Sequence, residues 1–231
     1  MERSVAFVRE YLGDVARSLG RAEPLAAQVA RARGAETRMR ERFGTNTHKG
    51  ALFLGGMVLV ARARTASDDE LGLRLALGRA AREVRPLLAN EGTHGAAARA
   101  RFRVGGILRE VADGLPSVFE VALPAFRAAL ASGEDGDAPS FRMLASLMRT
   151  VEDTTALHRC GADGLATLRA DGARLDGVLD ERGPGGAAAF LRERNAAYRA
   201  ANLTMGGVAD LLGLALGWLA WRREIPHEPR T

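Results

Sequence analysis

Apolar residues recur at helical spacing along most of this chain. The segment 141–151 shows the pattern clearly, with apolar side chains at Phe141, Met143, Leu144, Leu147, Met148 and Val151. Positions three and four apart lie on one face of a helix, and Pro139 and Ser140 just before them are a helix start signal. The pattern therefore predicts a helix with one buried face.

The same spacing predicts nine further helices. They cover residues 5–19, 24–42, 47–64, 69–85, 96–112, 117–130, 163–175, 187–200 and 204–222. We find no run of alternating β-branched and polar residues long enough to build a sheet. The fold class that we predict is all-α, as a single-domain bundle of about nine or ten helices.

Prolines and glycines divide these helices. We expect Pro124 to kink or end its helix, because proline has no backbone N–H and clashes with the preceding turn. The glycine-rich stretches 133–136 and 183–186 are typical of surface connections. No repeat of fixed period is visible, which argues against a solenoid.

Length and composition fit one globular domain. The chain has 231 residues, 47% of them hydrophobic, which is enough to bury one sizeable core. No low-complexity tract divides it. We therefore predict one domain over residues 1–231, with a flexible tail at 223–231.

The apolar pattern indicates neither export nor a bilayer span. Charges interrupt the apolar residues of the first segment every few positions, unlike the core of a secretory signal. The two most apolar runs, 51–61 and 211–221, are about half of the roughly twenty residues that a membrane-spanning helix needs. We therefore expect a cytoplasmic protein without a membrane partner.

The distribution of charge argues against nucleic acid as a partner. A net charge of +5 and a pI near 10.4 would favour binding to a phosphate backbone. Arginines, however, alternate with Glu and Asp, as in the segments 82–85 and 192–194, which is typical of solvated helix faces. We expect no nucleic-acid partner.

Spacing alone assigns no nucleophile and no zinc site. The histidines are too scattered for a zinc site, and no serine-histidine-acid arrangement can be recognised. The single cysteine, Cys160, excludes an internal disulfide and a cysteine-based zinc cage, and leaves a lone reactive thiol open.

Lys49 is the only lysine in the chain, and arginine supplies the other permanent cations. An Ala- and Arg-rich composition explains the loss of lysine but not the survival of one. An ammonium is a compact, freely rotating phosphate ligand that a guanidinium imitates poorly. A phosphate contact and chance survival are therefore the two interpretations of Lys49.

Lys49 lies in the polar segment 44–50, directly before the apolar run 51–54. A threonine of this segment can cap the following helix, which leaves free N–H groups and the positive dipole end beside Asn46, His48 and Lys49. Such a helix start suits a phosphate. The alternative is an ordinary capped helix with exposed polar residues, and the Gly-x4-Gly-Lys-Ser/Thr order of a Walker sequence is absent.

A second polar segment, 202–210, again opens an apolar helix with a capping threonine, Thr204. Gly206 and Gly207 fall in its first turn, where each costs about 1 kcal/mol relative to alanine. Close approach of a ligand or of another backbone would be a reason to accept that cost. Tight packing between helices is an equally good interpretation.

Acidic residues mark two further places where helices should end. Glu110 precedes the segment 114–116, and Asp153 precedes Arg159 by a few residues. Carboxylates near a helix end and a following arginine can hold magnesium and a polyphosphate, because Mg²⁺ prefers one or two carboxylates plus phosphate oxygens and water. Solvated acidic residues are the commoner alternative.

Asn46-Thr47-His48-Lys49-Gly50 resembles the Asn-Thr-His-Lys-Gly segment of the triphosphoribosyl-dephospho-CoA synthases, which serve citrate lyase and malonate decarboxylase. Four other segments follow in the family's order. Residues 93–95 resemble its Thr-x-Gly stretch, and 110–116 its Arg-Gly-Glu-Ala-x-x-Gly-Phe/Tyr-Pro segment. Asp153, Thr154, Arg159 and Gly161 fall on its Asp-Thr-Asn and Arg-Gly-Gly pattern, and 202–212 resembles its Asn-Leu-Ser-Pro-Gly-Gly-Ser-Ala-Asp-Leu-Leu signature.

The sequence departs from the family at several positions. Thr155 replaces an asparagine, Cys160 replaces a glycine, and Thr204-Met205 replaces a Ser-Pro pair, while the arginine before Glu110 has moved by one position. Family members also carry, upstream, Pro-Lys-Pro-Gly-Leu-Val-Asp and Gly-Ala-His motifs that this sequence lacks. We therefore expect a domain without the family's N-terminal part.

The resemblance implies a reaction and its ligands. The 5-triphosphoribosyl group of ATP moves to the 2′-hydroxyl of 3′-dephospho-CoA and adenine leaves, which makes the prosthetic-group precursor of an acyl-carrier subunit of the malonate decarboxylase or citrate lyase type. The implied ligands are ATP, 3′-dephospho-CoA and Mg²⁺. An acyl-carrier subunit is the implied downstream partner, and a homodimer stays open.

The resemblance also implies roles for ten residues. Glu110 and Asp153 are the candidates for base work and for magnesium. The candidates for nucleotide and phosphate binding are Asn46, His48, Lys49, Arg159, Asn202, Gly206, Gly207 and Asp210.

Three alternatives stay open. The chain could be a non-catalytic or repurposed nucleotide-binding or assembly protein of the same fold, a relative that acts on another nucleotide, or a nucleic-acid binder whose affinity falls steeply with salt. ATP-dependent release of adenine distinguishes the transferase from all three.

Overall fold

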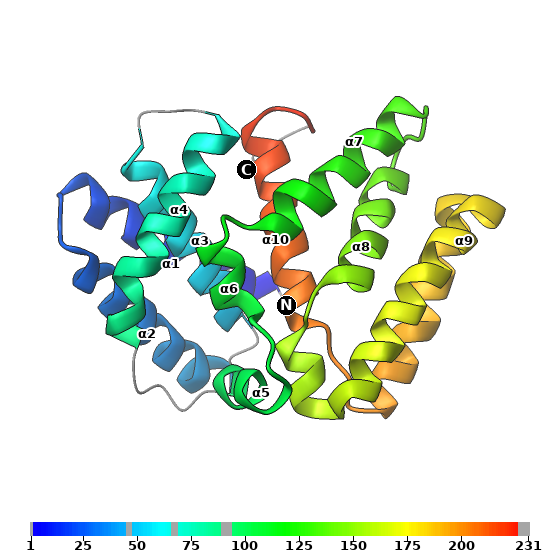
Figure 1. Ribbon diagram of the computed structural model, residues 1–231, viewed down its shortest axis with the longest axis horizontal. Helices are drawn as coiled ribbons and strands as arrows, with labels where there is room; N and C mark the ends of the chain where they lie inside the picture. Colours follow the sequence, from blue (N-terminus) through cyan, green and yellow to red (C-terminus); the bar gives the residue numbers. More distant parts are fainter. Residues whose placement is uncertain (1, 45–47, 66–68, 89–93, 226–231) are drawn as a thin grey trace. The chain divides into compact units, whose positions relative to one another are not determined.

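The computed structural model describes residues 2–44, 48–65, 69–88 and 94–225. Within these ranges the chain is helical and forms no strand, so the all-α prediction is confirmed (Figure 1). The α-helices are α1 (Glu2–Gly20), α2 (Leu25–Phe43), α3 (Lys49–Ala63), α4 (Glu70–Val84), α5 (His94–Phe102), α6 (Gly106–Ala112), α7 (Leu123–Ala131), α8 (Ala138–Thr150), α9 (Thr154–Ala200) and α10 (Gly206–Trp221). A 3-10 helix, η1 (Arg85–Leu88), follows α4, and a π-helix, η2 (Ser117–Ala122), precedes α7.

The helices gather in two compact units. The first unit comprises Met1–Gly92 and Ile107–Leu115, and the second unit comprises Thr93–Gly106 and Pro116–Thr231. Because the segment 107–115 returns to the first unit, neither unit is a continuous stretch of chain. The prediction of one domain over residues 1–231 stays a prediction.

In the first unit, α1, α2 and α3 pack around one apolar core. Its buried members are Phe7, Tyr11, Val15, Ala35, Met39 and Leu52. Two glycines in the middle of α3 allow a close approach to α1. A Cβ on Gly55 would lie 2.8 Å from Leu12 Cδ2, and a Cβ on Gly56 would lie 2.5 Å from the Tyr11 hydroxyl oxygen. The small residues of α3 thus serve helix packing.

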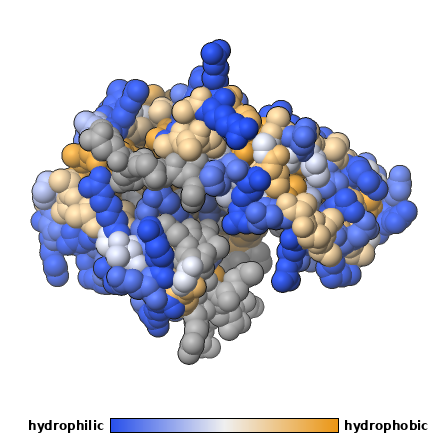
Figure 2. Space-filling view, turned by 90° about the horizontal axis from the view of Figure 1, so that it is seen from below, coloured by the Kyte–Doolittle hydropathy of each residue, from blue (hydrophilic) through white to orange (hydrophobic). Residues whose placement is uncertain are grey.

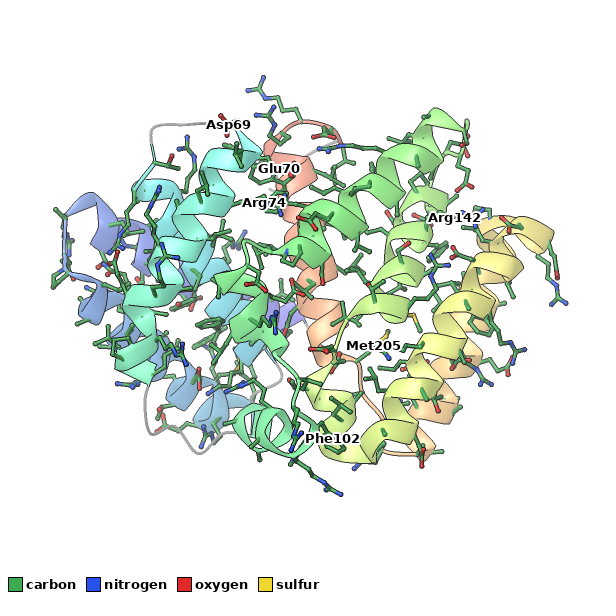
Figure 3. All side chains as sticks on the ribbon, in the orientation of Figure 1. Asp69, Glu70, Arg74, Phe102, Arg142 and Met205 are labelled. Atoms are coloured by element: carbon green, nitrogen blue, oxygen red, sulfur yellow. The ribbon has the colours of Figure 1, made fainter. Side chains whose placement is uncertain are left out.

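In the second unit, α8 is the central helix, and η2, α7, α9 and α10 all pack on it. Large buried side chains of this core are Leu123, Met143, Leu147, Leu168, Leu175 and Leu219. Outside the core, Arg142 of α8 (Figure 3) forms ion pairs with Glu134, Asp176 and Asp180. Because two of these acids belong to α9, the arginine attaches α9 to α8.

α9 is interrupted twice and folds back on itself. Gly161 and Gly183 have left-handed φ angles of 66° and 63°, so the helical stretches are 154–160, 162–182 and 184–200. Figure 1 shows the second and third stretches side by side as a hairpin. Tyr198 on the returning arm donates a 2.8 Å hydrogen bond to Asp171 Oδ2 on the outgoing arm. The predicted connection at 183–186 is confirmed as the turn of this hairpin.

The predicted helix 117–130 changes type along its length. Leu123 N–H donates to Val118 O, five residues back, which is π-helical pairing. Pro124 has no N–H to continue an α-helical ladder from the preceding turn. Pro124 therefore marks the passage from η2 to α7.

The prediction of one continuous helix over 96–112 is wrong. α5 ends at Phe102 (Figure 3), Arg103 and Gly106 have φ angles of 55° and 56°, and α6 then begins. Two contacts hold this break in the second unit. Gly105 N–H donates to Glu152 Oε2 at 3.0 Å, and a Cβ on Gly106 would lie 2.7 Å from Thr154 Cγ2. These tertiary contacts outweigh the local helical pattern.

The surface carries few large apolar side chains among the described residues. Those exposed are Val5, Leu71, Leu75, Leu130 and Trp221. Figure 2 shows one face, on which hydrophilic residues separate small apolar patches. Among the described helices, none alone is long and apolar enough to cross a bilayer; α6 and the helix over 117–131 reach that length only when taken together across a break.

Glu224 attaches the described end of the chain. It accepts two hydrogen bonds from Arg127 of α7, both at 2.9 Å. This bidentate ion pair holds the segment that follows α10. The predicted flexible tail at 223–231 stays a prediction, and its residues 226–231 lie outside the described ranges.

Candidate functional site

The start of α3 holds Lys49 beside a carboxylate. Lys49 is the first residue of α3, and its Nζ donates a hydrogen bond to Glu36 Oε2 of α2 at 2.5 Å. The Glu36 side chain is 17% exposed and the Lys49 side chain 39%. The carboxylate therefore lies deeper than the ammonium, and the ammonium is held at the helix start with part of its surface in solvent.

Tyr11 of α1 lies near this ion pair. Its side chain is buried, and burial together with the charge of Glu36 raises the pKa of Tyr11 to about 12. The phenol thus stays protonated at neutral pH. Glu36 is consequently next to a neutral hydroxyl, not a second anion.

His48, and not a threonine, occupies the position before α3. It is the N-cap residue, and its side chain makes no capping hydrogen bond. Burial lowers the pKa of His48, so the imidazole is neutral at pH 7 and can serve an anion by hydrogen bonding rather than by charge. Asn46 and the threonines at 45 and 47 lie outside the described residues.

Glu110 lies half-buried on α6, just before a left-handed turn. α6 ends with a 2.6 Å hydrogen bond from Leu115 N–H to Glu110 O, and Gly114 and Leu115 have φ angles of 79° and 59°. A Cβ on Gly114 would lie 3.0 Å from Cβ of Arg74 on α4 (Figure 3). The glycine of this motif therefore packs α6 against α4 and holds Glu110 within the first unit.

Asp153 joins the starts of two helices in the second unit. Its Oδ1 accepts hydrogen bonds from Thr155 N–H at 2.8 Å and Ala156 N–H at 3.1 Å, which caps α9. Its Oδ2 accepts a hydrogen bond from Val208 N–H, in the first turn of α10, at 3.0 Å. Asp153 is 1% exposed. The carboxylate is thus buried and satisfied by backbone donors.

This geometry gives Asp153 a structural task. A general base needs to reach the proton that it takes, and a magnesium ligand needs a free oxygen lone pair directed at the ion. Both Asp153 oxygens already face helix starts. The proposed base and magnesium roles of Asp153 stay predictions, and its surroundings do not support them.

The glycines of α10 let its first turn approach α9. A Cβ on Gly206 would lie 2.7 Å from Thr155 Oγ1, and a Cβ on Gly207 would lie 3.2 Å from Asp153 Oδ2. Two interpretations were open for these glycines, close approach of a ligand and tight packing between helices. The contacts at both positions agree with tight packing. Contact of these glycines with a nucleotide stays a prediction.

We expected Thr204 to cap α10, but it does not. The N-cap residue is Met205 (Figure 3), and the Thr204 hydroxyl is buried without a hydrogen-bond partner in the described part of the chain. The reason is that Asp153 supplies the capping oxygen from α9.

Arg159 and Asn202 form an exposed polar pair close to these helix starts in the chain. Arg159 Nη1 donates to Asn202 Oδ1 at 2.6 Å. Asn202 has a left-handed φ of 54°, which asparagine tolerates better than most residues. A guanidinium is a strong phosphate ligand, so this pair offers an anion contact at the surface. Asp210 lies half-buried on α10, four residues after Gly206.

Comparison with known proteins decides the family. Residues 1–228 match the family model of ATP:dephospho-CoA triphosphoribosyl transferase. The chain belongs to this family. The resemblance that the five sequence segments indicated is therefore confirmed.

Several similar proteins carry the name probable 2-(5''-triphosphoribosyl)-3'-dephosphocoenzyme-A synthase. The one from Azotobacter vinelandii is 35% identical over 217 residues, which cover 89% of this chain and 72% of the relative. The one from Pseudomonas syringae pv. tomato is 32% identical over 200 residues, which cover 84% and 67%. The one from Pectobacterium carotovorum subsp. carotovorum is 34% identical over 187 residues, which cover 77% and 59%. No solved structure matches the chain.

In this triphosphoribosyl transferase family member, the candidate residues fall into two groups. The first unit carries His48, Lys49 and Glu110; the second carries Asp153, Arg159, Asn202, Gly206, Gly207 and Asp210. Sequence reasoning missed Glu36. The available signal was its register, because Glu36 stands three residues before Met39, which is in the core, and four after Ala32, which packs against that core. A carboxylate in an apolar register indicates a partner.

A resident magnesium site has little support from the donor atoms of this family member. In the described ranges, no three His, Cys, Asp or Glu side chains form a metal-binding group. The oxygens of Asp153 are engaged by backbone N–H groups, which leaves Glu110 as the candidate carboxylate. Mg²⁺ that arrives on a triphosphate needs few protein ligands.

Proposed function

We propose that this chain transfers the 5-triphosphoribosyl group of ATP to the 2′-hydroxyl of 3′-dephospho-CoA. A bond forms between the acceptor oxygen and the anomeric carbon of ATP, and the bond from that carbon to adenine breaks. The hydroxyl loses its proton, and adenine leaves with a proton. The triphosphate stays on the transferred ribose.

The match of residues 1–228 to the ATP:dephospho-CoA triphosphoribosyl transferase family carries this proposal. The reaction needs ligands for a polyphosphate, a base for the hydroxyl, and help for the departing adenine. Two cations in polar segments near helix starts support the first requirement, Lys49 in the first unit and Arg159 in the second. A site built to hold a triphosphate needs such charge-assisted donors.

We assign the ligand contacts by chemistry. Lys49 and Arg159 bind phosphate by charge, and His48 binds it by hydrogen bonding. Asn46, Asn202 and Asp210 position the nucleotide or the ribose. Gly206 and Gly207 set the spacing between α9 and α10, so their contribution to nucleotide binding is indirect.

Of the two candidate bases, we favour Glu110. Its side chain is half-buried on α6, an intermediate environment for a group that must exchange a proton with substrate. Asp153 is buried and accepts three backbone hydrogen bonds. The Glu110→Gln variant should therefore lose turnover while keeping its fold.

The wider setting of the reaction is also proposed. The product is the prosthetic-group precursor of an acyl-carrier subunit of the malonate decarboxylase or citrate lyase type, as the family resemblance implies. Magnesium enters with ATP. We place the protein in the cytoplasm, where ATP is available, and a homodimer stays a prediction.

The experiment that tests the function is chromatographic detection of adenine. The purified chain is mixed with ATP, magnesium and dephospho-CoA, with Lys49→Ala as the control. We expect adenine only when the acceptor is present, and at least about tenfold less with the variant, because loss of a hydrogen bond to a charged group has an effect of this order. A folded sample that binds ATP but releases no adenine would identify a non-catalytic nucleotide-binding member of the fold instead.

A further inference from the structure

We propose that Glu36 is the positioning residue of Lys49, and that it fixes the ammonium of the only lysine in the chain at the start of α3 for an incoming polyphosphate. This inference rests on the proposed function, in which Lys49 binds phosphate. It adds a residue from α2 that the family motifs described above do not contain. Glu36 acts through Lys49 and has no contact with substrate of its own.

The geometry of the pair supports this role. Glu36 Oε2 and Lys49 Nζ are 2.5 Å apart and belong to successive helices, thirteen positions apart in the chain. A lysine side chain has many rotamers, and ordering it when a ligand binds costs conformational entropy. The ion pair orders the ammonium in advance. The cost is then met on folding and not on binding.

The burial of the two side chains indicates that Glu36 can hold the Lys49 ammonium without blocking the approach of a phosphate. The carboxylate is 17% exposed and the ammonium-bearing side chain 39%. An ammonium has three N–H donors, so a phosphate can approach from solvent while the inner hydrogen bond to Glu36 persists. The negative charge of Glu36 repels a phosphate, but the ammonium is the more exposed member of the pair.

The surroundings of Glu36 are fixed by packing. Tyr11 lies in the core next to it, and the close approach of Tyr11 to Gly56 fixes α1 against α3. The adjacent phenol is neutral, since burial and Glu36 keep its pKa high. Glu36 is therefore paired with Lys49 and lies close enough to a fixed, neutral side chain to act on it electrostatically.

Binding of inorganic tripolyphosphate, measured by calorimetry, tests the proposal without any turnover. Five chains are compared: wild type, Glu36→Gln, Lys49→Ala, the double variant, and Glu83→Gln. Glu83 is the matched control, because it pairs with Arg64 at 2.7 Å. That pair lies at the opposite end of α3, about 22 Å away along a 15-residue helix.

We expect a specific order of dissociation constants. Lys49→Ala should weaken binding by about tenfold or more, the effect expected for loss of a hydrogen bond to a charged group. Glu36→Gln should weaken it by about three- to fivefold, the size of a partly exposed ion pair. Glu36→Gln should have no further effect when Lys49 is already alanine, because the two side chains act as one unit. Glu83→Gln should bind as the wild type does.

A second measurement separates positioning from mere stabilisation. Because Lys49 is the only lysine, a chain labelled with ¹⁵N-lysine gives a single side-chain nitrogen signal that needs no assignment. In Glu36→Gln the order parameter of this nitrogen should fall, while in Glu83→Gln it should not change. An unchanged order parameter would show that Glu36 does not hold the ammonium, and the proposal would be wrong.

The binding results can also overturn the inference. Tighter tripolyphosphate binding by Glu36→Gln would show competition rather than positioning, and independent, multiplying effects of the two substitutions would show that Glu36 does not act through Lys49. Absence of tripolyphosphate binding by the wild type would also overturn the proposal, because Lys49 would then hold no polyphosphate. Failure of the transferase function is a different result: adenine is not released although tripolyphosphate binds in the expected order.

Discussion

The starts of α3 and α10 look alike in sequence but differ in structure. Each is a polar, threonine-containing segment that runs into an apolar helix. At α10, the buried carboxylate of Asp153 accepts the Val208 N–H, so the protein itself supplies an anion to that helix start. At α3, a partly exposed cation, Lys49, stands at the first position. Of the two helix starts that the sequence offers to phosphate, α3 is the better supported.

The largest loss of stability is expected on substitution of Asp153, and it tests whether this carboxylate caps the helix starts. Asp153→Ala removes the cap of α9 and leaves buried N–H groups of two helices without an acceptor, so we expect a loss of about 3 kcal/mol or more in the free energy of unfolding. Asp153→Asn should cost less, because its amide oxygen can still cap α9 while its NH₂ group cannot accept from Val208. Urea denaturation followed by circular dichroism measures both variants. A stable Asp153→Ala that loses only adenine release would instead show a chemical role.

A smaller effect is expected at Gly206. In Gly206→Ala the new methyl group would meet Thr155 Oγ1 at 2.7 Å, and forcing α10 away from α9 should cost about 1–3 kcal/mol. Gly213 is the matched control, because it lies on the same helix with no atom within 4 Å of a Cβ. Gly213→Ala should be neutral or stabilising by up to about 1 kcal/mol. Equal losses in thermal denaturation of both variants would contradict the packing contact.

The two tyrosines, one in each unit, should make the stability of the protein depend on pH. This dependence is expected in the alkaline range and not at neutral pH. Tyr11 is in the first unit and Tyr198 in the second, and Tyr is present only at these positions. Burial and Glu36 raise the pKa of Tyr11 to about 12. Burial and the hydrogen bond to Asp171 also raise the pKa of Tyr198.

Alkaline titration turns these pKa shifts into a stability prediction. An unfolded tyrosine has a pKa near 10.0, so above this value the unfolded chain loses protons that the folded chain keeps. The stability that the two buried tyrosines contribute is therefore fully present below pH 10, and it falls as the pH rises from about 10 to 12. Urea denaturation at several pH values, with phenolate absorbance as a second probe, should show this fall. Tyr11→Phe and Tyr198→Phe should each remove part of it; a pH-independent midpoint would contradict the buried positions.

The helical fold was largely predictable because its signal is local. Apolar spacing located the helices, and glycine runs located the turn at 183–186. The break between α5 and α6 was not predictable from spacing. It depends on Glu152 and Thr154, which are remote in the chain from Gly105 and Gly106. A pattern within one segment carries no information on such a partner.

The candidate site was predictable only as a set of residue types. Sequence identified Lys49 as unusual but could not find Glu36, because an ion pair between two helices depends on how the helices pack. It also assigned chemistry to Asp153, whose carboxylate the fold uses for helix capping. A short acidic residue before a helix has the same appearance in both roles, and only burial and hydrogen-bond partners separate them.

The return of residues 107–115 to the first unit has a consequence for synthesis of the chain on the ribosome. Domains generally fold as they emerge, with the N-terminal one first. Here the first unit lacks most of α6 until residue 115 has left the exit tunnel, and by then α5 of the second unit has emerged as well. Vectorial folding of the first unit therefore has to wait for part of the second, and a nascent chain stopped at residue 92 should be a good chaperone client.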